Sequence, residues 1–398
     1  MGSSTTTPPT EPNGARPRRA APARRVLFFT TSMGGGGAES HTLRVVNHID
    51  RSRYVPTLAV TARGGSYEPF LHADVEVLGL GLDRLPSSVG RHLAGIPPLM
   101  RIIDRLRPDI VCSVMDLPNV AAFAATRLLR RKPRHVFCVQ SPPIASYANT
   151  VLAPVLGPTL RNVYPRADRI ISLTHGVRGD LVEASPRLER NTVVIHNACV
   201  DERSDAARNA APTSDIPATT RPVLVAAGRL VPQKDYPTLL EALVVVRRQV
   251  DAELWILGDG VERSRIEDRV RELGLSSAVR MLGFQSAVLD FMKRADAFVL
   301  SSAYEGFGNV IVEALAVGTP VVSTNCPHGP DEILTHEENG LLVPVRDPEA
   351  LGAALARVLT DPALAARLRE NGPIRAEAFR AQRIASDYAD EFDRVLAE

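Results

Sequence analysis

The chain has 398 residues, of which 44% are hydrophobic and 23% charged, a composition typical of folded globular proteins and not of disordered ones. The 47 basic and 45 acidic residues leave a net charge of +2, which argues against a nucleic-acid-binding protein. At roughly 150 residues per domain, this length predicts two or three domains.

Residues 1–24 contain no apolar run, and five arginines fall within residues 1–25. A secretory signal needs an apolar stretch of about 7–15 residues, and we find no segment apolar enough for a transmembrane helix. The four cysteines form no C-x-x-C pair, which favours reduced thiols. We therefore expect a cytoplasmic protein with a disordered basic tail over residues 1–24.

Short runs rich in Val, Ile and Leu then alternate with amphipathic stretches up to residue 200. Several runs are apolar without alternation, as in strands buried on both faces of a parallel sheet. Residues 136–160 carry no charge but four prolines. They indicate either a strand followed by a surface loop, or a loop and short helix that meet a lipid or another apolar acceptor. The predicted strands are Val26–Thr31, Tyr54–Val60, Val75–Leu80, Ile110–Val114, His135–Gln140, Arg169–Thr174 and Thr192–His196.

Residues 201–222 are polar and lack an apolar period, so we interpret them as an interdomain linker. The alternation restarts after this linker, and we expect two Rossmann-like, doubly wound α/β domains, residues 25–200 and 223–373, facing each other across a cleft. A C-terminal helix over residues 374–398 is long enough to pack back on the first domain. The strands predicted for the second domain are Val223–Ala227, Glu253–Leu257, Val279–Leu282, Ala297–Ser301, Pro320–Thr324 and Gly340–Val343.

Four glycines, Gly34 to Gly37, follow the first predicted strand and precede a helix. Glycines let a backbone approach a phosphate closely, and a helix N-terminus favours negative charge. The alternative is a tight turn without a ligand. The dinucleotide fingerprint G-x-G-x-x-G would need glycine where Glu39 stands, which disfavours an NAD-dependent oxidoreductase.

Two cations follow the first predicted strand of the second domain. Arg229 and Lys234, the latter one of only three lysines, lie five residues apart in the loop before a helix. Ligands of doubly wound domains bind outside the carboxyl ends of the strands, so both cations would point into the cleft. An arginine fork and a lysine point charge suit a diphosphate; the alternative is a solvated loop with ordinary surface charges.

The segment SSAYEGFGNVIVEALAVGTPVVST combines two carboxylates with a helix start. Glu305 lies in the loop after a strand, Gly308 precedes the helix, and Glu313 lies about one turn inside it. The N–H groups of Asn309 and Val310 at the helix N-terminus suit a phosphate. Glu313 would accept hydrogen bonds from a ribose diol, and Glu305 would face the group attached to the diphosphate.

The motifs GRLVPQK, LGDGVE, LGF and EGFGNVIVEAL together resemble the family 4 retaining glycosyltransferases of the GT-B fold (glycosyl transferases group 1), over nearly all of residues 25–398. The resemblance implies that the C-terminal domain binds the sugar donor and the N-terminal domain the acceptor. It implies catalytic roles for Glu305, Arg229 and Lys234. The donor-binding residues matched by it are Gly36, Gly37, Arg229, Lys234, Gly258, Phe284, Glu305, Gly308, Asn309, Val310 and Glu313.

The sequence departs from the family pattern at the end of the strand that reads VFCVQSPP. Many members carry a histidine there, whereas this chain has Gln140. Gln140 and His175, which also follows a predicted strand, are the acceptor-side candidates.

By this resemblance, the chain would be a hexosyl- or N-acetylhexosaminyltransferase that uses a UDP-sugar, or secondly GDP-mannose. The acceptor would be a glycan, a lipid-linked sugar or a small molecule in cell-surface polysaccharide or glycoconjugate synthesis. No Asp-x-Asp occurs, so we expect no metal requirement. We also expect no cofactor, because the nucleotide sugar is a substrate. The basic tail and the uncharged segment predict peripheral association with the inner face of the plasma membrane. The alternatives are a nucleotide-sugar epimerase of the same fold and a noncatalytic partner subunit.

Overall fold

The computed structural model describes residue 2 and residues 22–82, 85, 88–147, 150, 152–210 and 216–398. The predicted basic tail, apart from Gly2 and residues 22–24, lies outside the described residues. The same holds for residues 148, 149 and 151 of the uncharged segment and for residues 211–215 of the predicted linker.

Within the described residues, the strands form two parallel sheets. The N-terminal sheet has the strand order β3-β2-β1-β4-β5-β6-β7, and the C-terminal sheet has the order β10-β9-β8-β11-β12-β13. In both sheets the order reverses beside the first strand, which makes the carboxyl end of that strand the topological switch point of a doubly wound domain.

All thirteen predicted strands are present, with bounds that differ from the predictions by at most a few residues. Their bounds are β1 (Arg24–Thr30), β2 (Tyr54–Val60), β3 (Glu76–Gly79), β4 (Ile110–Val114), β5 (Arg134–Val139), β6 (Arg169–Ser172), β7 (Thr192–Val194), β8 (Val223–Ala227), β9 (Glu253–Leu257), β10 (Val279–Gly283), β11 (Ala297–Leu300), β12 (Val321–Thr324) and β13 (Leu341–Val343).

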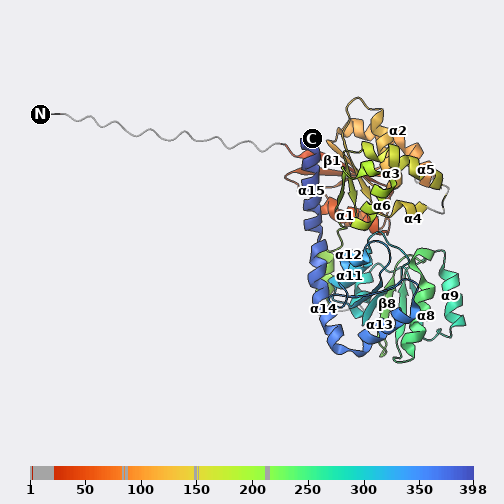
Figure 1. Cartoon of the computed structure of the whole chain (residues 1–398). Helices are drawn as coiled ribbons and strands as arrows, with labels where there is room; N and C mark the ends of the chain where they lie inside the picture. Colours follow the sequence, from red (N-terminus) through yellow and green to blue (C-terminus); the bar gives the residue numbers. More distant parts are fainter. Residues whose placement is uncertain are drawn as a thin grey trace.

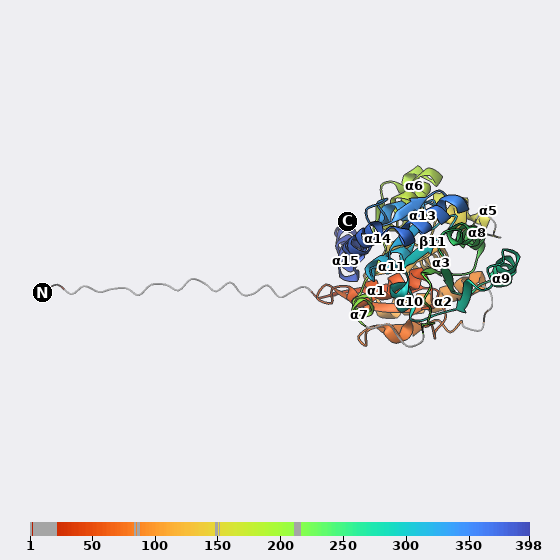
Figure 2. The same ribbon diagram turned by 90° about the horizontal axis from the view of Figure 1, so that it is seen from below.

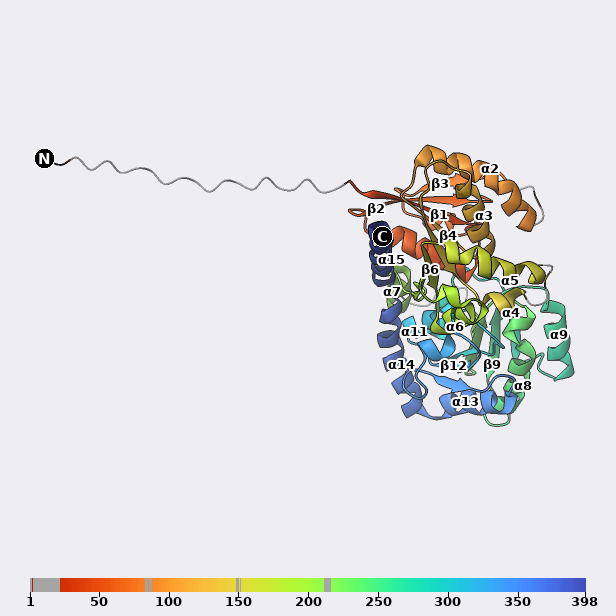
Figure 3. The same ribbon diagram turned by 45° about the horizontal axis from the view of Figure 1, so that its top comes forward.

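Helices cover both faces of the N-terminal sheet (Figure 3). Helices α1 (Gly37–His48) and α15 (Ala381–Ala397) pack on one face, and α2 (Ser88–Leu106) and α3 (Asp116–Arg127) pack on the other. The other helical segments of this domain are η1 (Glu68–Phe70), α4 (Pro143–Tyr147), α5 (Ala153–Asn162), η2 (Tyr164–Arg166), α6 (His175–Ala184) and η3 (Pro186–Leu188).

The C-terminal sheet is also covered on both faces (Figure 2). Helices α8 (Tyr236–Arg247) and α13 (Pro348–Thr360) pack on one face, and α10 (Val288–Arg294) and α11 (Asn309–Ala316) pack on the other. The other helical segments of this domain are η4 (Pro232–Lys234), α9 (Arg263–Glu272), α12 (Pro330–Ile333) and α14 (Pro362–Ala376).

The segment predicted as a linker contains a short helix, α7 (Glu202–Asn209). The helix forms without an apolar period because polar groups hold both ends. Asp201 and Ser204 form a capping box at its start, and Lys293 donates to backbone carbonyls of its last turn at 2.7 and 3.2 Å. Hydrophobic periodicity alone therefore missed this element.

The predicted C-terminal helix over residues 374–398 is interrupted. Helix α14 ends on the C-terminal domain, η5 (Glu377–Phe379) follows, and α15 then runs along the N-terminal domain (Figure 1). At the interruption the carbonyl oxygen of Phe379 accepts a hydrogen bond from the Cys199 N–H at 2.9 Å, and the Ala381 N–H donates to Val200 at 2.8 Å. The helix is therefore interrupted where the chain passes from one domain to the other, because the backbone of residues 379–381 bonds to residues 199–200.

Candidate functional site

The glycine loop of the N-terminal domain contacts the C-terminal domain. Gly36 caps α1, and the carbonyl oxygen of Gly37 accepts a hydrogen bond from Asn309 Nδ2 at 3.0 Å. A Cβ placed on Gly35 would lie 3.4 Å from the ring of Phe284, so loop and ring are in contact. Predicted donor-binding residues from the two domains therefore lie together.

Lys234 and Glu305 form an ion pair that the sequence analysis did not predict. Lys234 Nζ lies 2.6 Å from Glu305 Oε1, and the Ser302 hydroxyl donates to the same oxygen at 2.6 Å. Both side chains are largely buried, with 14% of Lys234 and 8% of Glu305 exposed. The predicted phosphate cation and the predicted sugar carboxylate thus lie in direct contact.

Arg229 lies in the loop after β8 and is exposed. Its positive charge acts on Glu39, which lies on the first turn of α1 in the opposite domain. Burial raises the pKa of Glu39, while a hydrogen bond to its own backbone and the positive charge of Arg229 oppose the rise. In the sequence Glu39 stands only where a dinucleotide fingerprint would need glycine, and the influence of Arg229 on it comes from the arrangement of the two domains.

Gly258 holds the loop after β9 close to the loop that carries Arg229. Its φ of +132° lies in a region that favours glycine, and a Cβ there would collide with the carbonyl oxygen of Gly228. Only glycine permits this approach, so the LGDG motif brings the two loops together.

Glu313 lies within an interdomain charge network. Its Oε1 is 3.7 Å from a guanidinium nitrogen of Arg44 on α1, and Arg44 Nε donates to Asp201 at 2.9 Å. Burial raises the pKa of Glu313, and the charge of Arg44 opposes this effect. Arg44, which the sequence analysis did not select, therefore favours the ionised form that two ribose hydroxyls would need.

The start of α11 has the geometry expected from the sequence. Gly308 adopts a left-handed conformation, with φ +97° and ψ 51°, immediately before the helix. Asn309 and Val310 occupy the first turn, and Asn197 Nδ2 donates to Asn309 Oδ1 at 3.0 Å. The side chain of Asn309 thus joins the first turn of α11 to two segments of the N-terminal domain.

The two acceptor-side candidates are both near the C-terminal domain. A Cβ on Gly306 would lie 2.9 Å from the carbonyl oxygen of Gln140, so this backbone packs beside the loop of Glu305. His175 is the first residue of α6, and its ring is exposed. Their assignment to the acceptor stays a prediction.

Glu332 of α12 joins the domains and was missed by the sequence analysis. Its carboxylate accepts hydrogen bonds from the N–H groups of His175 and Gly176 at 3.0 and 3.1 Å, and His196 Nε2 lies 3.0 Å away. Burial alone would raise the pKa of Glu332. The bonds from His196 and the two amides outweigh that effect and lower the pKa from about 4.5 to about 2.

Glu332→Gln should reduce the free energy of unfolding at neutral pH, because it removes the charge that His196 and the two amides stabilise. We expect a reduction of only about 1–2 kcal/mol, since solvent screens part of the interaction. The folded-state pKa lies below the usual value, so this contribution is present above about pH 4.5 and lost as the pH falls toward 2. Thermal unfolding from neutral to acidic pH measures it. Glu370→Gln, exposed on α14, is the control, and equal effects of both variants would contradict the prediction.

The arrangement suits a nucleoside diphosphate linked to a further group. Arg229, Lys234 and the N-terminus of α11 supply positive charge for phosphate oxygens. Glu313 supplies a carboxylate for a diol, and Glu305 lies beside the cation that would hold the diphosphate. Charge of this kind stabilises a departing diphosphate.

Two family models match the chain. The glycosyltransferase family 4 model matches residues 35–203, and the glycosyl transferases group 1 model matches residues 211–375. LpsE of Rhizobium meliloti, a lipopolysaccharide core biosynthesis glycosyltransferase, is 37% identical over 54% of this chain and 61% of its own length. LpsD of the same organism is 37% identical over 44% of this chain and 50% of its own length. The chain therefore matches about half to three fifths of the length of these two relatives.

A Campylobacter jejuni protein, named N-acetylgalactosamine-N,N'-diacetylbacillosaminyl-diphospho-undecaprenol 4-alpha-N-acetylgalactosaminyltransferase, is 29% identical over 69% of this chain and 73% of its own length. Among solved structures, Anabaena HepE in complex with UDP and glucose has a TM-score of 0.77 at 22% identity, covering 93% of this chain and 99% of HepE. Sucrose-phosphate synthase of Thermosynechococcus elongatus has a TM-score of 0.79 at 20% identity, covering 94% and 99% of the two chains. These structures share the two-domain GT-B fold.

Proposed function

The chain belongs to glycosyltransferase family 4, and from this membership we propose that it is a retaining glycosyltransferase that uses a nucleotide-diphosphate sugar. The observation that carries the proposal is the ion pair between Lys234 and Glu305 at the carboxyl ends of the C-terminal strands. In the proposal, Lys234 binds a phosphate of the donor and Glu305, next to it, faces the sugar.

UDP is the favoured nucleotide of the donor, with GDP second. HepE, which shares the fold, was solved with UDP and glucose, and the Campylobacter relative is named for transfer of N-acetylgalactosamine. The names support a hexosyl or N-acetylhexosaminyl donor for this chain. Glu313, whose charged form Arg44 favours, would hold the ribose in either case.

In the proposed reaction the bond between the anomeric carbon and the diphosphate breaks first. Arg229, Lys234 and the α11 N-terminus stabilise the leaving diphosphate, and Glu305 faces the positive charge that develops on the sugar. The acceptor hydroxyl attacks from the same face and passes its proton to the leaving phosphate, so configuration is retained. This scheme assigns the stabilising positive charge to protein groups and not to a metal.

The acceptor is proposed to be a glycan or lipid-linked sugar in cell-surface polysaccharide synthesis, since LpsE and LpsD are named for lipopolysaccharide core biosynthesis. No helix among the described residues is both long and apolar enough to cross a bilayer. Peripheral membrane association stays a proposal. It is supported by the uncharged segment, in which Ile144 of α4 and Val155 of α5 are exposed by 47% and 56%.

A panel of UDP- and GDP-sugars, scored by thermal shift and by donor hydrolysis, tests the donor. We expect one nucleotide class to raise the unfolding temperature of the protein and one sugar donor to be hydrolysed slowly. A metal chelator should change neither result. Nuclear magnetic resonance of the product then reads its anomeric configuration. An interconverted nucleotide sugar without transfer would instead indicate the epimerase, and binding without any turnover would indicate a noncatalytic subunit.

A further inference from the structure

The edge of the N-terminal sheet where the strands begin is strongly basic. In a parallel sheet all strands start at one edge, and β5, β6 and β7 are neighbours in the strand order. The segments that enter these strands, residues 128–133, 161–168 and 185–191, therefore lie side by side. The predicted donor site lies at the carboxyl ends of the strands, at the opposite edge.

Seven exposed cations gather on these three entering segments, against one exposed carboxylate, Glu189. Within the described part of the chain, only Arg131 among them forms an ion pair, with Asp109 at 4.0 Å. On α9, by contrast, Arg269 and Arg271 each bond to an acid. The seven cations are Arg130, Arg131, Lys132, Arg161, Arg166, Arg187 and Arg190.

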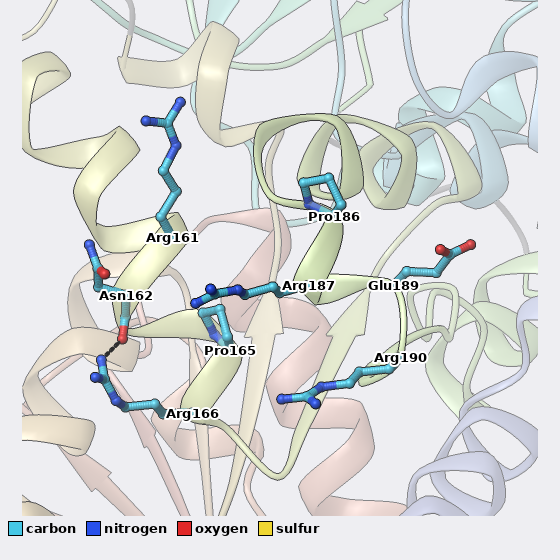
Figure 4. A pocket seen from close by; sticks show the side chains of 8 residues that line it. All are labelled: Arg161, Asn162, Pro165, Arg166, Pro186, Arg187, Glu189 and Arg190. Atoms are coloured by element: carbon cyan, nitrogen blue, oxygen red, sulfur yellow. Dashed lines mark hydrogen bonds between the residues drawn. The ribbon is translucent and has the colours of Figure 1, made fainter.

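Four of these arginines line a hollow of about 580 Å³ between the end of α5 and η3 (Figure 4). The buried side chains of Tyr164 in η2 and Leu188 in η3 anchor its two walls. Figure 4 shows the carboxylate of Glu189 directed away from the arginine side chains. The lining residues are Arg161, Asn162, Pro165, Arg166, Pro186, Arg187, Glu189 and Arg190.

We propose that this arginine hollow is a binding site for a phosphate-bearing group, separate from the donor site. Guanidinium forks bind phosphate oxygens with two parallel hydrogen bonds, and several of them around one concave surface select multiply charged anions. The phosphate comes either from an anionic lipid headgroup or from a soluble phosphorylated molecule. The site does not depend on the proposed transfer reaction.

The double variant Arg187→Glu/Arg190→Glu tests the site, with Arg101→Glu/Arg105→Glu on the exposed face of α2 as a control of equal charge. One arm measures cosedimentation with vesicles of equimolar phosphatidylglycerol and phosphatidylcholine, and with phosphatidylcholine alone. The other arm titrates inorganic pyrophosphate into protein saturated with UDP, so that the donor site is occupied. Circular dichroism and UDP affinity report whether each variant remains folded.

We expect the wild type to bind one of the two probes in a salt-sensitive manner. Each basic residue near an anionic bilayer strengthens binding about fivefold, so the double reversal should weaken vesicle binding at least about twentyfold. Binding of vesicles alone identifies a lipid headgroup, and binding of pyrophosphate identifies a soluble ligand. If the wild type binds neither probe, or if the α2 control loses as much binding as the hollow variant, the proposal is wrong. UDP affinity should stay unchanged in both variants.

Discussion

Glu305→Gln should lower kcat by about 10²–10³, the loss typical for a group that stabilises charge in the transition state. Glu305 is buried, accepts from Ser302 and pairs with Lys234 at 2.6 Å. In the proposed reaction this carboxylate faces the sugar, where positive charge develops as the bond to the diphosphate breaks. Glutamine keeps the shape but not the charge.

Glu313→Gln should mainly raise the donor KM, by contrast. Glu313 is assigned to the ribose, which does not change during the reaction, and interactions equal in the ground and transition states do not lower the chemical barrier. Its contact with Arg44 places it in the interdomain network, whereas Glu305 pairs with Lys234. Each variant is therefore the matched control of the other.

Steady-state kinetics of both variants, together with UDP titration, measure this difference. UDP affinity should stay near the wild-type value in Glu305→Gln, because loss of the carboxylate leaves Lys234 free to bind phosphate. Wild-type kcat in Glu305→Gln would overturn the assignment. So would a loss of UDP affinity as large as that of Glu313→Gln.

Lys234→Ala should weaken UDP and the intact donor alike, by about 10- to 100-fold, because a hydrogen bond to a charged group contributes about 1.5–3 kcal/mol. The sugar preference should survive, since both ligands present the same phosphate oxygens. The structure adds a second expectation. Without Lys234 the carboxylate of Glu305 is buried and unpaired, so kcat should fall as well.

Calorimetry with UDP and steady-state kinetics measure these two effects separately. Arg105→Ala is the control, because Arg105 is exposed on α2 of the N-terminal domain and belongs to neither proposed site. Unchanged UDP affinity in Lys234→Ala would remove Lys234 from the donor site. If UDP affinity falls but kcat stays at the wild-type value, Lys234 binds the donor but does not support the catalytic role of Glu305.

The fold was predictable because strands buried on both faces of a parallel sheet leave uninterrupted apolar runs. The helix predicted after Arg229 and Lys234 is likewise present as α8. Elements held by polar contacts were not predictable in this way. Helix α7 depends on a capping box and on Lys293, and the interruption before α15 depends on backbone pairing with residues 199–200.

The sequence is enough to indicate which loops carry the candidate chemistry, because residues that follow parallel strands gather at one edge of a sheet. It also points to the glycines, cations and glutamates of the predicted donor site. Their partners depend on the tertiary structure. Lys234 meets Glu305 over 71 residues of chain, and Asn309 meets Gly37 over 272. Strand order and domain docking determine such pairs, and neither leaves a periodic signal in the sequence. The arginine hollow arises in the same way, because three segments become neighbours only when β5, β6 and β7 align.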